Sequence, residues 1–200
     1  KRMKKLSNYK LKKYRNNLVD ILDRTPKDTF NEAKLWYYRE NEWLNKVANY
    51  YDKEAENIAM ITARLSVRNK WVRNKIDTQK VCISKKWNIP RYKIKICTPS
   101  IHKNKAYDIY EYQSVINRDA LKIYSFYNNL LLNDKYVTID VWQKRALLNK
   151  YNVDKFVPNK IQYKQLEDLH ISLAKDYNLK GFELQSIIWT QKRNEHYGIQ

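Results

Sequence analysis

The sequence is poor in the residues that mark turns, and it is poor in cysteine. Only 2 glycines and 4 prolines occur among 200 residues, so turns that depend on them are scarce and a mostly helical chain is expected. Cys82 and Cys97 are the only cysteines and match no zinc-ligand spacing, which favours two reduced thiols over a disulfide. No run of about 18 apolar residues exists, and no hydrophobic segment follows the basic start. We therefore expect no membrane association and a cytoplasmic location.

Several motifs of enzymes are also missing. The chain has no GxGxxG or GxxxxGK[ST] phosphate-binding loop, no HExxH zinc site and no GxSxG nucleophile turn. The three histidines are scattered and belong to no ligand motif. No cofactor or metal is expected, and any catalytic centre has to be built from other residues.

Basic residues are what the sequence has in excess. Lys and Arg number 40 against 21 Asp and Glu, which gives a net charge of +19 and a pI of about 9.7. Such a charge makes a polyanion, nucleic acid above all, the expected partner. The 6 Trp and 17 Tyr are suited to stacking on bases, although most aromatic residues of a folded chain lie in its core. The plainer reading is a basic protein whose charge serves solubility alone.

Apolar residues recur at three- and four-residue steps along most of the chain, which is typical of amphipathic helices. We predict an all-α fold of about nine or ten helices in one domain over residues 1–200. Residues 1–25 form a basic N-terminal arm or helix, and residues 158–195 form closing helices. A helix is expected over residues 75–89, with Ile76, Val81, Cys82, Ile83 and Trp87 as its apolar positions.

Four positions carry helix-start signals. Thr29 and Glu32 have capping-box spacing, and Asp52, Ser100 and Asp140 each precede an apolar helical stretch. Between Pro90 and Pro99 the alternation of apolar and polar residues indicates a short extended piece.

Lys122 and Asp140 are the strongest candidates for chemistry. Lys122 is the only charged residue between Leu121 and Leu132, so this helix is expected to be mostly buried and the pKa of its lysine lowered by lost hydration. A free amine there can attack a carbon centre and form a Schiff base. Asp140, at a helix start, can stabilise developing positive charge or move a proton. The plainer readings are a lysine that reaches solvent and an aspartate that only caps its helix.

Three segments extend this pair into a pattern. The segment Val137–Trp142 reads V-T-I-D-V-W, residues 65–74 read L-S-V-R-N-K-W-V-R-N, and residues 102–106 read H-K-N-K-A. In this order and spacing they resemble the helix–hairpin–helix (HhH-GPD) DNA glycosylase superfamily over about residues 55–150. The patterns L-S-x-x-x-x-W-x-x-N and V-T-I-D-x-W are most similar to phage-encoded glycosylase-like proteins, which would place this chain in the cytoplasm of a bacterial host.

The chain departs from that family at three points. The glycines usual in the hairpin are absent from residues 117–121, Trp142 replaces the histidine that follows the aspartate, and no four-cysteine cluster follows. Phosphate contact is then expected to fall to Arg118 and nearby lysines. An iron–sulfur cluster is excluded.

The resemblance implies a two-lobed helical fold and a monomer that binds double-stranded DNA. Such a protein flips a nucleotide into a cleft between its two helical subdomains and excises a damaged or modified base. Lys122 would attack the sugar C1′ and give an imine that can go on to nick the strand, and Asp140 would support the positive charge at the sugar. The implied DNA-binding residues are Ser66, Arg68, Lys70, Arg73, Asn74, Lys105 and Arg118, and the implied base-pocket residues are Trp71, Tyr124 and Trp142. Arg68 falls where the family has a wedge glutamine.

Three alternatives remain open at the level of sequence. The first is an enzyme that modifies DNA bases on the same fold without excising them, as in phage pathways that decorate thymine. The second is a glycosylase-like module that binds DNA or a protein without catalysis. The third is a basic structural or RNA-binding helical protein.

Overall fold

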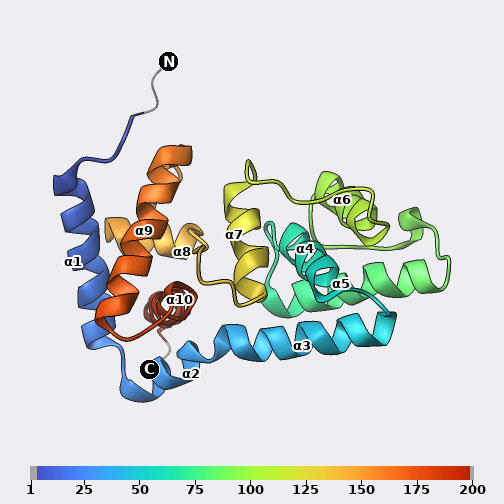
Figure 1. Ribbon diagram of the computed structural model, residues 1–200, viewed down its shortest axis with the longest axis horizontal. Coiled ribbons are helices and arrows are strands. Elements are labelled where there is room, and N and C mark those ends of the chain that lie inside the picture. The colour runs from blue at the N-terminus through green and yellow to red at the C-terminus, as the bar shows by residue number, and fades with distance from the viewer. Residues whose placement is uncertain (1–3, 199–200) are drawn as a thin grey trace. The chain divides into compact units, whose positions relative to one another are not determined.

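The computed structural model describes residues 4–198 and is all-α, as the sequence predicts (Figure 1). Ten α-helices and one short 3-10 helix make up the described part of the chain, with no strand among residues 4–198. Contacts divide the chain into two compact units: unit 1 comprises Lys1–Arg39 and Leu132–Gln200, and unit 2 comprises Glu40–Leu131. No helix within the described residues is long and apolar enough to cross a membrane.

Unit 1 is built from the two ends of the chain. Its helices are α1 (Asn8–Arg24), α2 (Lys27–Lys34), α8 (Val141–Leu148), α9 (Lys160–Asp176) and α10 (Gly181–Tyr197). Helix α10 packs against the other four, and nearly all of its first half is buried. Its apolar residues Phe182, Leu184, Ile187 and Ile188 form part of the core of unit 1, and the polar residues Glu183, Gln185 and Ser186 are buried with them.

Unit 2 is arranged around a fully buried helix. Helix α4 (Ala55–Leu65) packs against α5 (Trp71–Lys86), α6 (Ser100–Tyr110) and α7 (Leu121–Leu130). Every residue of α4 from Asn57 to Leu65 is buried. Helix α3 (Trp36–Tyr51) begins at the end of unit 1 and contributes most of its length to unit 2, and η1 (Arg91–Lys93) lies between α5 and α6.

The cap predictions give a mixed result. Asp140 caps α8 as expected. The capping box at Thr29 is wrong, because α2 begins earlier, after Pro26, whose missing N–H and fixed φ suit a helix start. Asp52 does not cap α4 either, because it has φ +50° and the helix begins three residues later, after Glu54. Ser100 is the first residue of α6, after Pro99, and is not its cap.

Two further expectations are wrong. The segment between Pro90 and Pro99 forms η1 and irregular chain, not an extended strand. Helix α5 begins at Trp71 and not at residue 75. Of its expected apolar positions Val81 and Cys82 are buried, whereas Ile76 and Ile83 are exposed, as is Trp87, which directly follows the helix. The buried face of α5 is instead largely polar and consists of Asn74, Asp77, Thr78, Val81, Cys82 and Ser84.

Candidate functional site

Asp140 is held firmly by the end of a buried segment. Its Oδ1 accepts a hydrogen bond of 2.9 Å from the backbone N–H of Gln143, in the first turn of α8. Just before it, the N–H of Val137 donates to Glu167 Oε1 at 3.0 Å, and the N–H of Ile139 donates to the Tyr163 hydroxyl at 3.0 Å. The carboxylate itself is half-buried. These contacts give Asp140 a fixed position in unit 1.

A buried tyrosine lies close to Asp140. Tyr37 is 1% exposed, and its hydroxyl shares a hydrogen bond with Thr138. Burial raises the pKa of Tyr37 far above its ordinary value, and the negative charge of Asp140 acts in the same direction. Tyr37 is therefore a neutral hydroxyl at any physiological pH, a group that sequence reasoning missed because it lies about a hundred residues away in the chain.

Lys122 is exposed, which contradicts the expectation of an apolar wall around its amine. Helix α7 packs through its second half, where Ser125 and Tyr127–Leu130 are buried, while its first turn is at most half-buried. The helix follows a turn in which the N–H of Ala120 donates to the carbonyl of Asn117 at 3.2 Å. Lys122 lies in unit 2 and Asp140 in unit 1.

The connection between α4 and α5 and the first turn of α5 carry three of the expected DNA-binding residues on their surface. Arg68, Lys70 and Arg73 are exposed. Arg68 has φ +55°, a left-handed conformation that a residue with a Cβ adopts only at a cost. Ser66 is half-buried, and its hydroxyl donates to the carbonyl of Ala63 at 2.7 Å. Thr98 donates to the carbonyl of Val67 at 3.0 Å and so fixes the start of α6 beside this connection.

Five of the expected cations form no ion pair within residues 4–198: Arg68, Lys70, Arg73, Lys105 and Lys122. All five are exposed. Arg118 is also exposed and lies in the loop before α7. Unit 2 therefore presents positive charge that its own carboxylates do not neutralise, which is the electrostatic condition for binding a polyanion.

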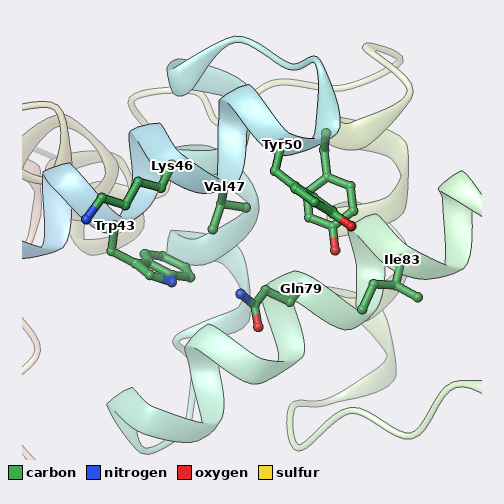
Figure 2. Close-up of a pocket in the computed structure, with 7 residues that line it drawn as sticks. Trp43, Lys46, Val47, Tyr50, Gln79 and Ile83 are labelled. Atoms are coloured by element: carbon green, nitrogen blue, oxygen red, sulfur yellow. The ribbon is translucent and has the colours of Figure 1, made fainter.

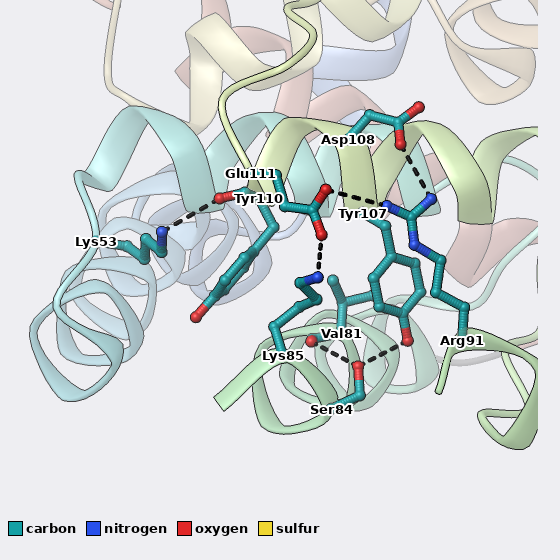
Figure 3. Close-up of polar contacts among 9 residues, drawn as sticks. All are labelled: Lys53, Val81, Ser84, Lys85, Arg91, Tyr107, Asp108, Tyr110 and Glu111. Atoms are coloured by element: carbon teal, nitrogen blue, oxygen red, sulfur yellow. Dashed lines mark hydrogen bonds and ion pairs between the residues drawn. The ribbon is translucent and has the colours of Figure 1, made fainter. Parts of the chain in front are cut away.

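Other cations of unit 2 are engaged in the fold, as Figure 3 shows. Arg91 pairs with Asp108 at 3.0 Å and with Glu111 at 3.3 Å, and Lys85 also pairs with Glu111. Lys53 donates to the carbonyl of Tyr110 at 3.2 Å. These contacts tie η1 and α5 to α6. We assign these cations to structure, in contrast to the five without ion pairs.

Asn74 is the clearest correction among the predicted DNA-binding residues. It is 1% exposed, and its Nδ2 donates to the carbonyl of Thr62 at 3.0 Å. The side chain closes the contact of α5 with α4, because both helices present polar groups to each other there. Asn74 cannot reach DNA in this fold.

The three expected base-pocket aromatics lie in separate clusters. Trp71 is half-buried in unit 2, with its ring centroid 6.2 Å from that of Trp43 and 6.0 Å from that of Phe126. Tyr124 packs edge-on against Tyr127, 5.2 Å between centroids. Trp142 belongs to unit 1 and packs against the His196 ring at 5.4 Å.

Arg64 is a residue that sequence reasoning did not select. It is 7% exposed, its Nε is buried without a hydrogen-bond partner, and no carboxylate among residues 4–198 pairs with it. Burial lowers its pKa. Burial also lowers the pKa of His102, and the positive charges of Arg64 and Lys105 act in the same direction. Arg64 at the end of α4 therefore lies near His102 and Lys105 in the first turns of α6. No local pattern of the sequence predicts this proximity.

No group of three or more potential metal ligands occurs among residues 4–198. Cys82 and Cys97 are free, as expected. Burial raises the pKa of the Cys82 thiol to about 12, so it stays protonated and unreactive at neutral pH.

A comparison with family models matches residues 1–196 to the model described as "Family of unknown function (DUF7178)". The chain belongs to this family. No curated protein and no solved structure matches it.

Proposed function

We propose that this chain binds double-stranded DNA through unit 2 and acts as a DNA glycosylase on a damaged or modified base. The observation that carries the DNA-binding part is the set of five exposed cations without ion pairs on unit 2. Each cation placed on a phosphate releases counterions, so binding should weaken steeply as salt rises. The base-excision part of the proposal rests on the resemblance of residues 55–150 to the helix–hairpin–helix DNA glycosylase superfamily.

In this proposal Lys122 is the nucleophile. Its amine nitrogen attacks the sugar C1′, the bond from C1′ to the base nitrogen breaks, and the base leaves with the bonding electron pair and takes up a proton. The C1′–O4′ bond of the sugar ring then breaks, O4′ takes up the proton that the nitrogen loses, and the resulting imine can eliminate the 3′ phosphate. The attack needs the lysine as a free amine, and bound DNA that excludes water around the amine would favour that form.

Asp140 has the supporting role in the proposal. Its carboxylate stabilises the positive charge that develops on the sugar as the base departs. The hydrogen bond from the Gln143 amide keeps the carboxylate in one orientation.

The second candidate is a DNA-binding module without catalysis. Two observations favour it: Lys122 is exposed in the first turn of α7, and Asp140 already has a structural role as a helix cap. The two candidates share the same DNA surface and differ only in chemistry.

Reductive trapping separates them. The protein is incubated with duplexes that carry modified or damaged bases in the presence of borohydride, and a covalent adduct is sought by gel shift. We expect an adduct with the native chain and with Lys135→Ala, an exposed lysine outside the site, and none with Lys122→Ala. Salt-sensitive binding with neither adduct nor abasic site across the panel would leave the binding module as the function.

A further inference from the structure

A shallow groove between α3 and α5 lies within unit 2. Helix α3 contributes Trp43, Lys46, Val47, Tyr50 and Tyr51, helix α5 contributes Gln79 and Ile83, and the volume is about 380 Å³. Figure 2 shows Trp43, Val47 and Tyr50 reaching from α3 toward α5, with Gln79 and Ile83 facing them. None of these residues is among those assigned to the duplex-binding surface above.

Flat rings dominate the α3 side of this groove. Tyr50 is 69% exposed, and its ring lies edge-on to that of Tyr51, 4.9 Å between centroids. Trp43 is half-buried, and Val47, with 5% exposure, closes the floor. Single exposed tyrosines are common on protein surfaces. Three rings along one groove offer instead a stacking surface for planar groups.

Lysines accompany the rings. The Lys86 Nζ lies 4.5 Å from the centroid of Tyr50 and 5.7 Å from that of Tyr51, and the Lys75 Nζ lies 5.3 Å from the centroid of Trp43. Lys75 pairs with Glu40 at 2.9 Å. Lys46 and Lys86 have no carboxylate partner within residues 4–198. The groove therefore combines stacking rings with two ammonium groups that no acid neutralises.

We infer that the α3–α5 groove binds single-stranded nucleic acid, with bases stacked on Tyr50 and Trp43 and phosphates placed at Lys46 and Lys86. Charge complementarity selects a polyanion, and the rings select one whose planar groups are free to stack. The bases of a duplex are already stacked on each other and cannot reach the rings. The Gln79 amide faces the groove and offers both a donor and an acceptor to a base edge.

The test uses the full chain and a fluorescently labelled dT oligomer, with anisotropy measured at several salt concentrations. Tyr50→Ala should weaken binding about 5- to 100-fold, the range found when one stacking aromatic is removed. Lys46→Gln and Lys86→Gln should each lower the salt slope by about 0.7, because each removes one phosphate contact. Tyr92→Ala is the matched control: Tyr92 is 80% exposed beside two basic residues of the same unit but lies outside the groove.

Two further measurements keep the result specific. An abasic oligomer of the same length should bind the native chain and Tyr50→Ala equally, since it has no base to stack. Poly-glutamate should compete weakly. Equal loss in Tyr50→Ala and Tyr92→Ala, or equal competition by poly-glutamate and oligo-dT, would overturn the inference, the second result pointing to an acidic protein partner.

The groove does not depend on base excision. Lys122→Ala should bind oligo-dT like the native chain, and the Tyr50 variant should bind duplex DNA like the native chain. Failure of the trapping experiment therefore leaves this inference standing, and failure of the oligo-dT experiment leaves the proposed excision standing.

Discussion

The carboxylate of Asp140 accepts a hydrogen bond from the backbone amide of Gln143 at 2.9 Å and thereby caps α8. Asparagine caps helices about as well as aspartate, whereas alanine costs about 0.5–2 kcal/mol. Asp140→Asn should therefore keep the free energy of unfolding close to that of the native chain, and Asp140→Ala should lower it by about 1 kcal/mol. Urea unfolding measures both.

The same two variants separate capping from chemistry. If Asp140 supports base excision, Asp140→Asn should lose activity as fully as Asp140→Ala, because asparagine carries no charge. An active Asp140→Asn protein would reduce Asp140 to a helix cap.

Arg68 combines an exposed charge with a left-handed backbone, φ +55°. Glycine adopts this conformation without the steric cost of a Cβ, so Arg68→Gly should raise the free energy of unfolding by up to about 1 kcal/mol. Duplex affinity should fall and its salt slope should shrink by about 0.9, the loss of one phosphate contact. Asn88→Gly is the control, since Asn88 also has positive φ, +52°, but no charge. Unchanged duplex binding in Arg68→Gly would remove Arg68 from the DNA surface.

The periodicity of apolar residues predicts the helices well because most of them bury an apolar face. It does not reveal which face of α5 is buried, since Asn74, Asp77 and Thr78 point into unit 2 and Ile76 and Ile83 point to solvent. Polar contacts such as the one from Asn74 to the Thr62 carbonyl replace apolar packing there. The motif over residues 65–74 therefore predicted a DNA-binding role for Asn74, although the side chain of Asn74 forms a hydrogen bond between α5 and α4.

The resemblance implies two lobes, but the residues that make up each unit could not be predicted from the sequence. Unit 1 depends on α1 packing against α8, α9 and α10, and contacts between the two ends of a chain leave no local pattern. The position of Asp140 was predictable, because an aspartate before an apolar helix is a local signal. The exposure of Lys122 was not, because it depends on how far along α7 the packing extends.

Arg64 is buried without a carboxylate partner. Taking a charge out of water is costly, and replacing buried ionic groups by apolar residues of similar volume is often stabilising. Arg64→Met should raise the free energy of unfolding by about 1–2 kcal/mol. The measurement is chemical denaturation, with duplex binding tested in parallel. A less stable Arg64→Met protein would show that the guanidinium is solvated or paired in a way that outweighs its burial.

His170 gives unit 1 a dependence on pH. The ring is fully buried, with Nδ1 2.7 Å from the carbonyl oxygen of Leu166 and Nε2 2.9 Å from Gln143 Oε1. Burial lowers its pKa to about 4, against an ordinary value of 6.5. The unfolded chain therefore takes up a proton at higher pH than the folded chain does. Stability should be full above pH 6.5 and should fall by about 3 kcal/mol as pH drops toward 4.

The hydrogen bonds of His170 give a physical meaning to the opposite outcome, a stability that rises as pH falls. Both ring nitrogens face oxygen atoms, and only the imidazolium can donate to both at once. If these two bonds outweighed burial, His170 would stay charged in the folded chain and stability would rise as pH falls. Urea unfolding between pH 7.5 and 4.5 of the native chain and of His170→Gln isolates the contribution of the ring, because the other titrating groups are common to both.

Gly181 is the first residue of α10 and lies against the buried segment that leads to Asp140. A Cβ added there would lie 2.8 Å from Val137 Cγ2 and 3.1 Å from Ile171 Cγ1. Both neighbours are short, branched side chains within the fold, so they cannot swing aside, and overpacking of this kind costs about 1–3 kcal/mol.

Gly181→Ala should therefore lower the thermal midpoint of unfolding. Gly198→Ala, at the end of the same helix, is the control: its added Cβ meets no atom within 4 Å, so it tests only the cost of the positive φ of +65°. A shift of Val137 would also move Asp140, so Gly181→Ala should reduce base excision more than duplex binding. Equal stability of Gly181→Ala and the native chain would show that α10 can move away from Val137 without loss.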